Sequence, residues 1–484
     1  RDAYDAVILG AGTAGLVAAI EAHDLGLKPV VLEKMDYAAG NSLYASGGIA
    51  AWGTPQQKAE GHEESREAFR ADMMKVSENR ADPALVDTYV AHIGEDLEWL
   101  KSHVGVKFGK IRPMPYPRLG RTCRVLGDGI TGGARLVQYL LAAAKKRGIE
   151  IRYEHKVIEL LHDDHFRVTG VKTLSDEGQK EWLAKGGVCL TTGGFSANPE
   201  MVDRYIGGWA TRMVLRGSKS TTGENVSLTL PLYAKFVNMD QFHCGPIIGV
   251  THVNPADVLN SGYGVQVNTS GKRFMDEGCC RMGYLNEFTN KYLAEVDFAE
   301  STAAKFFSIV PTNWEEHYDA WKDFSDISIH NAYRNVDPEA WIKGDTLEEL
   351  AEGMIAYADE EGWAHDYTVE AIVESINRYN ELVAAGNGDE DFGKRDEYMV
   401  PIEAPCYAVP RGANNIDALV DGLWCDGNFQ CLDVDMKPIE GLFAVGNASG
   451  PFFGNSNYPM DIEGLSVGRA ITTGFATGRY VAGL

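Results

Sequence analysis

A glycine-rich segment near the beginning of the chain has residue types and a spacing that could hold a phosphate group. It reads Gly10-Ala11-Gly12-Thr13-Ala14-Gly15 and follows an apolar run at residues 6–9. A run without polar alternation is typical of a parallel strand that is buried on both faces. Between a strand and a helix, such glycines permit a tight turn, a close approach to a pyrophosphate and close helix packing. The segment therefore predicts a dinucleotide-binding turn, with phosphates at the N-terminus of the helix.

A carboxylate stands where the same type of site needs one. A second apolar run, residues 29–32, is followed by Glu33, Lys34 and Met35. A carboxylate about 20 residues after the glycine-rich turn can accept hydrogen bonds from both ribose hydroxyls of an adenosine. The two strands and the helix between them form a βαβ unit, which predicts a doubly wound sheet. These residues alone do not distinguish FAD from a nicotinamide dinucleotide.

Several further turns combine glycine with small or polar residues, and such turns can approach a ligand closely. Each of them could also be an ordinary tight turn. A ligand that is contacted from so many separate segments is long and buried, which favours FAD. The remaining predicted cofactor-binding residues are Gly40, Asn41, Ser42, Ser46, Gly47, Gly48, Val157, Thr192, Gly193, Gly194, Asn198, Thr222, Gly223, Gly446, Asn447, Gly464, Leu465 and Ser466.

The order of the patterns along the chain indicates an α/β protein with an inserted domain. Buried-strand patterns return at residues 187–190 and 441–445. We therefore predict a Rossmann-like FAD-binding domain formed by residues 1–238 and 417–484, interrupted by an α+β capping domain at residues 239–416. Further helices are predicted at residues 83–100, 132–147, 346–361 and 369–385, and further strands at 149–153, 157–162 and 168–173.

Length and charge limit the classes of protein to which the chain can belong. Its 484 residues are too many for one hydrophobic core. Its formal net charge of −24 repels nucleic acid and anionic lipid, and no apolar run approaches the ~18 residues that span a bilayer. The acidic surface suits solubility or, alternatively, docking of a basic electron-transfer partner. No CxxC pair occurs among the 8 cysteines, and we predict no metal site.

The order of these motifs resembles the flavoprotein of fumarate reductase and succinate dehydrogenase over nearly the whole chain. The most specific string is Thr192-Gly193-Gly194-Phe195-Ser196-Ala197-Asn198-Pro199-Glu200-Met201, and Gly271-Lys272-Arg273-Phe274 follows it in the expected order. The resemblance implies an FAD domain, a mobile capping domain and a substrate held between them over the flavin ring. It also implies a reaction at a carbon–carbon bond next to a carbonyl group.

Arg281 matches a catalytic position of this family. The family pattern Gly-Lys-Arg-Phe-x-x-Glu-x-x-x-Arg runs here from Gly271 to Arg281, and the resemblance implies that Arg281 donates a proton to the substrate. Reduction of an activated C=C bond needs a hydride on one carbon and a proton on the other, from a donor fixed in a closed site. Because arginine is ordinarily a poor acid, an anion-binding or ion-pairing role is the alternative.

The chain departs from the family where a dicarboxylate would be bound. The His-His-Thr-x-Gly-Gly segment of fumarate reductases is replaced at residues 417–422, and their Gly-Ala-Asn-Arg segment is replaced at residues 454–459. Asn260 stands near the place of an arginine that relays protons. The Tyr458-Pro459 pair resembles the related ketosteroid dehydrogenases, in which this tyrosine hydrogen-bonds the substrate ketone. Packing against the flavin is the alternative role for Tyr458.

These features predict an FAD-dependent reductase of an α,β-unsaturated carbonyl or carboxylate compound, from a bacterium, with a substrate larger and less charged than fumarate. Arg281 and Tyr458 are its predicted catalytic residues. One alternative is a ketosteroid-type dehydrogenase running in reverse, against which Arg281 argues because those enzymes carry tyrosine there. The other is a flavin subunit that only relays electrons.

The cofactor's attachment and the electron source are also predicted. Succinate dehydrogenases attach FAD through a histidine, and residues 40–46 contain none, so we expect non-covalent FAD. No second dinucleotide fingerprint is visible, so we expect a separate flavin or cytochrome protein or domain to supply electrons. The chain begins with Arg1 close to its first strand. We therefore expect that an upstream segment was removed, which leaves the bacterial cytoplasm and the cell envelope open as compartments.

Overall fold

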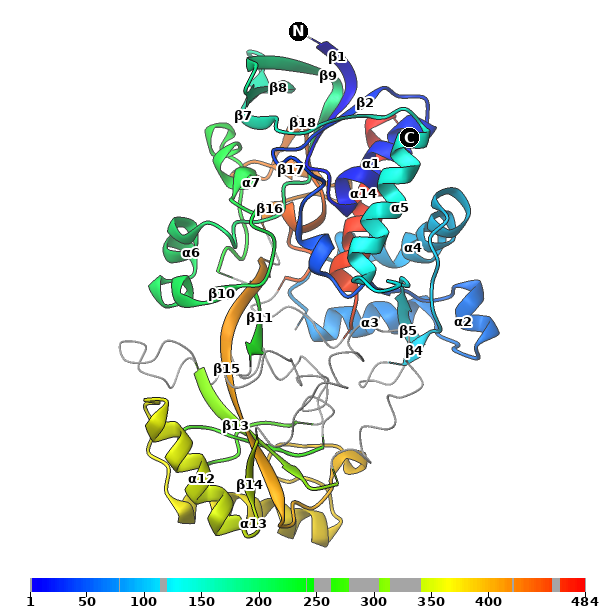
Figure 1. Cartoon of the computed structure of the whole chain (residues 1–484). Coiled ribbons are helices and arrows are strands. Elements are labelled where there is room, and N and C mark those ends of the chain that lie inside the picture. Colours follow the sequence, from blue (N-terminus) through cyan, green and yellow to red (C-terminus); the bar gives the residue numbers. More distant parts are fainter. Residues whose placement is uncertain are drawn as a thin grey trace.

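The computed structural model describes residues 2–77, 79–113, 120–240, 242–247, 263–277, 304–313, 341–419, 422–454 and 462–483. A large sheet with its helices forms one end of the molecule, and a smaller group of strands and helices forms the other end (Figure 1). The first sheet is mainly parallel and the second is mainly antiparallel. The predicted α/β fold with an inserted α+β part is therefore confirmed.

The main sheet contains both strands of the N-terminal βαβ pattern. Its central order is β17-β18-β9-β1-β2-β6, in which β1 pairs in parallel with β2 and β9. Ile8 packs in the core on one face of the sheet, whereas Val7 and Leu9 pack in the core on the other face. This burial on both faces explains the unbroken apolar run. The strands are β1 (Asp2–Leu9), β2 (Pro29–Leu32), β6 (Glu150–Arg152), β9 (Gly178–Leu190), β17 (Gln430–Leu432) and β18 (Pro438–Ala444).

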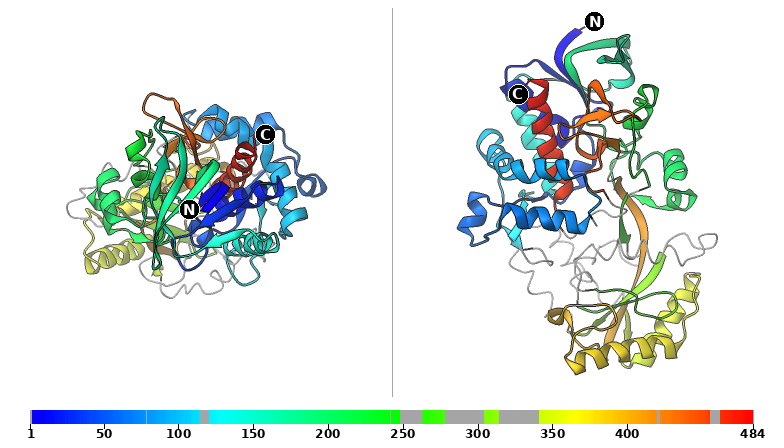
Figure 2. Two further views of the ribbon diagram at one scale, coloured as in Figure 1. Left: turned by 90° about the horizontal axis from the view of Figure 1, so that it is seen from above. Right: turned by 180° about the vertical axis from the view of Figure 1, so that it is seen from behind.

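Helices cover one face of this sheet. The first helix, α1, lies against both α14 and α5, and α14 also contacts α4. Figure 2 shows this helical layer from above and from behind. The α4 helix begins after Asp82, whose carboxylate accepts a hydrogen bond from the Ala84 N–H, a side-chain cap of the kind that starts helices. The bounds are α1 (Thr13–Asp24), α3 (Arg66–Val76), α4 (Pro83–Trp99), α5 (Gly132–Lys146) and α14 (Leu465–Val481).

An antiparallel extension packs on the other face. It consists of β7 (Lys156–His162) and β8 (Val168–Ser175), which pair with each other, and β8 pairs with the first part of β9. Trp182, on β9, is fully buried between this extension and the sheet and donates a hydrogen bond to Thr173 Oγ1. The extension therefore closes the second core of the sheet.

The smaller part is built around the long strand β15 (Cys406–Leu419). Its first half pairs with β13 (Ala304–Pro311) and β14 (Ile342–Gly344), and its second half pairs with β10 and β11. Figure 1 shows β15 running from the smaller part toward the main sheet. The other elements here are β10 (Val214–Leu215), β11 (Phe242–Ile247), β12 (Val265–Val267), α12 (Leu347–Glu360) and α13 (Val369–Ala385).

The acidic helices predicted at residues 346–361 and 369–385 are confirmed. Thr346 and Thr368 each accept a hydrogen bond from the backbone N–H three residues later, so each caps its helix. The boundaries of the three predicted domains stay predictions. Short elements complete the described part: β3 (Gly48–Ala50), β4 (Arg112–Pro113), β5 (Gly120–Arg124), β16 (Leu423–Trp424), β19 (Ser449–Gly450), α2 (Pro55–Ala59), α6 (Pro199–Tyr205), α7 (Glu224–Ser227), η1 (Asn41–Tyr44), η2 (Leu100–Val104), η3 (Gly208–Arg212), η4 (Leu230–Leu232), η7 (Asp396–Tyr398) and η8 (Gly446–Ala448).

Candidate functional site

Four of the predicted turns follow directly on the carboxyl ends of neighbouring parallel strands. Gly10 follows β1, Glu33 follows β2, Thr192 lies two residues after β9, and Gly446 lies two residues after β18. Because β1, β2, β9 and β18 are parallel, these turns share one edge of the sheet. Open α/β sheets bind their ligands at this edge. The structure therefore brings the separate sequence motifs into one candidate site.

The three glycines of the fingerprint serve different purposes. A Cβ on Gly15 would lie 2.1 Å from the carbonyl oxygen of Gly10, so this glycine is needed for close packing of α1 on the turn. Gly10 has a φ of +117°, and an added Cβ would lie 2.9 Å from the carbonyl oxygen of Thr191. A Cβ on Gly12 would meet no described atom closer than 3.6 Å. Of these three glycines, only Gly12 has room where a side chain would lie. Such room lets a ligand approach the backbone closely.

Glu33 is held rigidly by the backbone around it. One carboxylate oxygen accepts a hydrogen bond from the Ala11 N–H at 2.9 Å, and the other accepts from the Met35 N–H at 3.0 Å. Burial raises the pKa of Glu33, while these N–H groups oppose the shift. Each oxygen keeps further acceptor capacity, so two ribose hydroxyls could be bound as the sequence predicts.

Glu224, which was not predicted as a site residue, binds both Lys34 and Thr222. The Lys34 ammonium donates to Thr222 Oγ1 at 2.5 Å and to a carboxylate oxygen of Glu224 at 2.6 Å. Asn198 donates to the carbonyl oxygen of Thr222 at 3.0 Å. The buried Glu224 therefore ties the turn at Gly223 to the end of β2. An acidic residue directly after this glycine turn was the available signal.

The second glycine-rich stretch packs against the start of α5. A Cβ on Gly47 would lie 2.6 Å from the Cα of Gly132, and one on Gly133 would lie 2.0 Å from the carbonyl oxygen of Ser42. Asn41 Oδ1 accepts a hydrogen bond from the Ser218 N–H at 2.7 Å. The sequence predicts a helix that begins at Gly132 and Gly133 but indicates no role for these two glycines. Their pairing with residues 42–47 shows that both sides must be free of side chains.

The C-terminal turns meet the same stretch. Gly464 has a φ of +97°, and an added Cβ would lie 2.6 Å from the backbone nitrogen of Ile49. Asn447 Oδ1 accepts hydrogen bonds from Ser466 Oγ at 3.1 Å and from the Arg469 guanidinium at 2.6 Å. Leu465 and Ser466 form the first turn of α14, whose N-terminus has no side-chain cap. The helix N-terminus therefore lies at this site, where its dipole favours negative charge.

An ion pair beside these turns was also missed. Arg124, on β5, donates to Glu463 and to the carbonyl oxygen of Ser46. Both charged side chains are almost completely buried. The pair connects β5 to the loop just before α14, two residues from the first residue of the helix. The two side chains are 339 positions apart in the sequence, so sequence spacing does not reveal this contact.

Val157 lies in strand β7 and not in a turn at the edge of the sheet. Its side chain is buried in the second core of the main sheet. The residues just before β7 lie beside Glu33. The Glu154 N–H donates a hydrogen bond to the carbonyl oxygen of Met35, and the His155 N–H donates one to the carbonyl oxygen of Glu33. The Val157 side chain thus belongs to the hydrophobic core, and a contact between Val157 and the cofactor stays a prediction.

Two buried hydroxyls test whether the site fits FAD. Thr13 Oγ1 and Thr192 Oγ1 are buried and have no hydrogen-bond partner among the described residues. They belong to turns at the ends of β1 and β9, and α1 begins beside them without a side-chain cap. A buried polar atom without a partner costs free energy unless a ligand or water satisfies it. The donors and acceptors present therefore fit a dinucleotide with a pyrophosphate.

The predicted catalytic residues cannot be placed. Arg281, Tyr458 and Asn260 lie outside the described residues. The described part of the catalytic motif ends at Glu277, which forms an ion pair with Arg273. In the ranges that the structure describes, no group of three or more His, Cys, Asp or Glu could hold a metal ion, and no helix is long and apolar enough to cross a membrane.

Comparison with known proteins identifies the family. The model of the FAD binding domain family matches residues 5–457. This chain belongs to that family. The expected resemblance to fumarate reductase flavoproteins is confirmed at this level, and the binding of FAD follows from the family and from the site geometry.

Two curated relatives show the range of the family. The chain is 28% identical over 490 residues to an NADH:fumarate oxidoreductase of Klebsiella pneumoniae, covering 99% of this chain but 48% of the relative. It is 26% identical over 514 residues to a vinyl phenol reductase of Lactiplantibacillus plantarum, covering 100% of this chain and 97% of that one. The chain thus spans about half the length of the first relative and nearly all of the second.

Solved structures show the same fold. The open conformation of a flavocytochrome c3 fumarate reductase aligns with a TM-score of 0.71 at 24% identity, covering 100% of this chain and 78% of the other. A 3-ketosteroid Δ4-(5α)-dehydrogenase from Rhodococcus jostii RHA1, in complex with 4-androstene-3,17-dione, aligns with a TM-score of 0.78 at 23% identity, covering 100% and 97%. Both likenesses concern the fold alone.

Proposed function

We propose that this chain is an FAD-dependent reductase that saturates an activated carbon–carbon double bond. The observation that carries the proposal is the catalytic motif of the fumarate reductases, which ends here in Arg281, on a chain whose parallel sheet brings four predicted cofactor-binding turns to one edge. Relatives named as reductases of fumarate and of a vinyl phenol support the same reaction type.

The described residues have clear roles toward the cofactor. FAD, when bound, would supply a hydride from N5 of its flavin. The turn around Gly12 would hold the pyrophosphate at the N-terminus of α1, and Glu33 would accept hydrogen bonds from the ribose. The N-terminus of α14 would favour negative charge near Leu465 and Ser466 through its dipole. The other predicted cofactor contacts belong to the same proposal.

Two side chains would act on the substrate. Arg281 would donate the proton to the carbon that does not receive the hydride. Tyr458 would stabilise charge that develops on a carbonyl oxygen by donating a hydrogen bond from its neutral hydroxyl. Neither role requires a second charged clamp, which is consistent with the replaced segments at residues 417–422 and 454–459.

The substrate is inferred to be less charged than fumarate. Two carboxylates in a closed site need paired donors, because their desolvation is otherwise uncompensated. The family residues that supply these donors are absent from the matching positions of this chain. The vinyl phenol reductase, whose length this chain nearly covers, carries a name that fits an aromatic and weakly charged substrate.

Reoxidation of the reduced flavin tests the proposal. The bound FAD is photoreduced without oxygen, and fumarate, 4-vinylphenol, cinnamate and 4-androstene-3,17-dione are added separately. We expect rapid reoxidation by at least one of the last three compounds and slow reoxidation by fumarate. The proposal is wrong if none reoxidises the flavin while a saturated 3-ketosteroid bleaches the oxidised flavin. That result would establish the dehydrogenase alternative, which the likeness to the ketosteroid dehydrogenase fold keeps in view.

Two further proposals concern the cofactor and its electrons. We infer non-covalent FAD, so precipitation with acid should leave yellow flavin in the supernatant, whereas fluorescence on the denatured protein band would show a covalent bond. We also infer an electron donor outside this chain, a flavin or cytochrome protein or domain. This is consistent with a flavocytochrome among the similar structures. NADH alone should therefore not reduce the bound flavin at a catalytic rate.

A further inference from the structure

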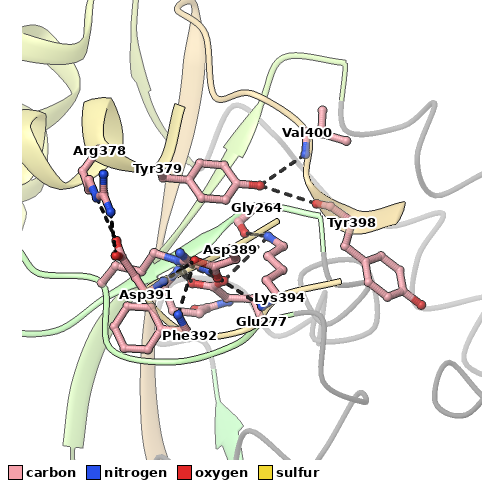
Figure 3. A network of polar contacts seen from close by, with 12 residues as sticks. Gly264, Glu277, Arg378, Tyr379, Asp389, Asp391, Phe392, Lys394, Tyr398 and Val400 are labelled. Atoms are coloured by element: carbon pink, nitrogen blue, oxygen red, sulfur yellow. Dashed lines mark hydrogen bonds and ion pairs between the residues drawn. The ribbon is translucent and has the colours of Figure 1, made fainter. Parts of the chain in front are cut away.

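The smaller part of the molecule contains four charged side chains that are almost completely removed from water. The side chains of Arg273 and Glu277 are 5% and 3% exposed, and those of Asp389 and Lys394 are both 0% exposed. Figure 3 shows Glu277, Asp389 and Lys394 in this network. None of the four contributes to the FAD-binding edge. Charged side chains are almost never fully buried unless they are paired, because burial of an unpaired charge costs much free energy. We therefore ask what this buried network does.

Arg273 is at the centre of the network. Its Nη2 lies 2.7 Å from Glu277 Oε2 and 2.6 Å from Asp389 Oδ2, and its Nε donates to Glu277 Oε1 at 3.0 Å. The guanidinium also lies over the rings of Tyr379 and Phe392, at 4.9 and 5.0 Å from their centroids. The two carboxylates and the two rings therefore fix the orientation of this planar group.

Lys394 completes the network. Its ammonium donates to the carbonyl oxygen of Gly264 at 2.6 Å and lies 3.6 Å from Glu277 Oε2. Burial lowers the pKa of Lys394 to about 8, while the charge of Glu277 opposes that shift. With Arg273 and Lys394 positive and Glu277 and Asp389 negative, the network has no net charge.

The carboxylates also bind the backbone of separate segments. Glu277 Oε1 accepts a hydrogen bond from the Gln266 N–H on β12, at 3.0 Å. Asp389 accepts hydrogen bonds from the N–H groups of Asp391, Phe392 and Lys394. The network thus joins residues 264–277 to the loop after α13. The path of the chain is fixed up to Glu277, which is four residues before Arg281 in the sequence.

A role in stability alone does not explain this arrangement. A buried ion pair often contributes no more stability than apolar residues of the same size, because the desolvation of the charges offsets their attraction. Ion pairs at these positions do restrict the chain to one geometry, since any other arrangement would leave a buried charge without its partner. The network is therefore better suited to holding a chain segment in one position than to raising the free energy of unfolding.

We propose that Glu277 and Lys394 are positioning residues that orient the chain segment leading to Arg281. The inference rests on the proposed function, because it assumes that Arg281 donates the proton. A catalytic donor that is displaced by about 1 Å can lose about a hundredfold in rate. Loss of the Glu277 carboxylate should therefore slow the chemical step without weakening FAD binding.

The test uses two substitutions whose charges compensate. Glu277→Gln leaves the network with one excess positive charge, and the double variant Glu277→Gln with Lys394→Met is neutral again but lacks the hydrogen bonds of the carboxylate. Each protein is loaded with FAD, confirmed to be folded by circular dichroism, photoreduced and mixed with the panel compound that reoxidises the parent fastest, beginning with 4-vinylphenol. The rate is expressed per bound flavin, so that a smaller folded fraction does not affect it.

We expect the saturating reoxidation rate to fall about 10- to 100-fold in both variants, with the half-saturating concentration changed by less than about threefold. The thermal unfolding temperature of the double variant should recover toward that of the parent. Arg378→Gln is the matched control, because Arg378 forms an exposed ion pair with Asp391 in the same region (Figure 3) and should behave like the parent.

The remaining outcomes separate the inference from the proposed function. If both variants reoxidise within twofold of the parent, or if the double variant regains the parental rate, Glu277 does not position the donor and the inference is wrong. Arg281→Lys is measured in parallel. A slow Arg281→Lys variant beside a fast Glu277→Gln variant overturns only the inference, whereas a fast Arg281→Lys variant overturns the proposed proton donor as well.

Discussion

The FAD-binding edge and the smaller part of the molecule differ in which of their buried polar groups lack a partner. At the edge, the hydroxyls of Thr13 and Thr192 are buried without a partner among the described residues, and two helices begin without side-chain caps. In the smaller part, one Arg273 nitrogen, Nη1, also has no hydrogen-bond partner among the described residues, but each charge of the Arg273 network has an opposite charge within 4 Å.

This difference indicates what each region is built to do. Groups left without partners inside a protein indicate a ligand, because their desolvation must be offset by something that the chain does not supply. Groups paired among themselves indicate a fixed geometry. We therefore assign binding of the cofactor to the first region and placement of the proton donor to the second. The following predictions test this division, beginning with the largest effect.

Arg281 should be essential to chemistry and irrelevant to the cofactor. In Arg281→Lys, turnover should fall by at least about 100-fold, the loss expected when a general acid is misplaced. The FAD content, measured by absorbance after release from the protein, should equal that of the parent. Turnover close to the parental rate would mean that the arginine binds an anion or forms an ion pair instead.

Tyr458 should affect the rate through its hydroxyl alone. Tyr458→Phe keeps the ring, so FAD content should not change, while flavin reoxidation by a carbonyl-containing substrate should slow by about 10- to 1000-fold, as for loss of one oxyanion donor. Stopped-flow measurement of reoxidation provides the rate. An unchanged rate would assign the ring to packing against the flavin, and the anchor of the carbonyl group would have to be sought elsewhere.

Asp96 should make the FAD-binding part less stable as the pH rises. Burial raises the pKa of Asp96 to about 7, although its hydrogen bond from Thr472 opposes the shift. Since the ordinary value is 3.8, the folded state holds an extra proton between about pH 4 and 7, and stability is lost as the pH rises through that window. The neutral variant Asp96→Asn should therefore be more stable than the parent at pH 8, by up to about 4 kcal/mol.

The comparison of Asp96→Asn with the parent needs two pH values. Thermal unfolding at pH 5 should show a clearly smaller advantage for Asp96→Asn than at pH 8, because the loss of parental stability between about pH 4 and 7 is then only partly complete. An advantage of the same size at pH 5 and pH 8 would contradict the assigned cause.

Gly15 should tolerate no side chain, because its added Cβ would lie 2.1 Å from a backbone oxygen. Gly15→Ala should destabilise the folded protein by roughly 1–3 kcal/mol, the usual cost of overpacking, and should lower the retained FAD. The control is Gly427→Ala, where the new Cβ would lie 3.5 Å from the Cβ of Ala84, an ordinary contact. Equal melting temperatures for the two variants would show that the turn is not closely packed.

Local patterns were sufficient to predict most of the elements. The apolar run at residues 29–32 is β2, and the helix expected at residues 369–385 is α13 with the same bounds. Both predictions succeed because they depend on residues that are close in the sequence. An unbroken apolar run indicates a strand buried on both faces, and a regular apolar stripe indicates a helix with one buried face. The glycine-rich turns were found for the same reason, since each carries its own spacing signal.

Long-range pairs could not be predicted in this way. Glu224 pairs with Lys34 across 190 positions, and Arg124 pairs with Glu463 across 339 positions. The charged network of the smaller part was missed even though Arg273 and Glu277 stand in a recognised motif. Their partners Asp389 and Lys394 lie more than a hundred positions later, beyond both α12 and α13, and nothing in the spacing indicates which charges the fold brings together.

We propose that the bound flavin of this chain reduces a carbon–carbon double bond with a proton from Arg281. A single turnover can show this: FAD-loaded protein is photoreduced without oxygen, mixed with excess 4-vinylphenol or another reactive compound of the panel, and the saturated product is counted against the bound flavin. On this proposal we expect one product molecule per reoxidised flavin in the parent, and almost none over the same time in Arg281→Lys with equal FAD content. Flavin reoxidation without saturated product, or equal product from both proteins, would contradict it.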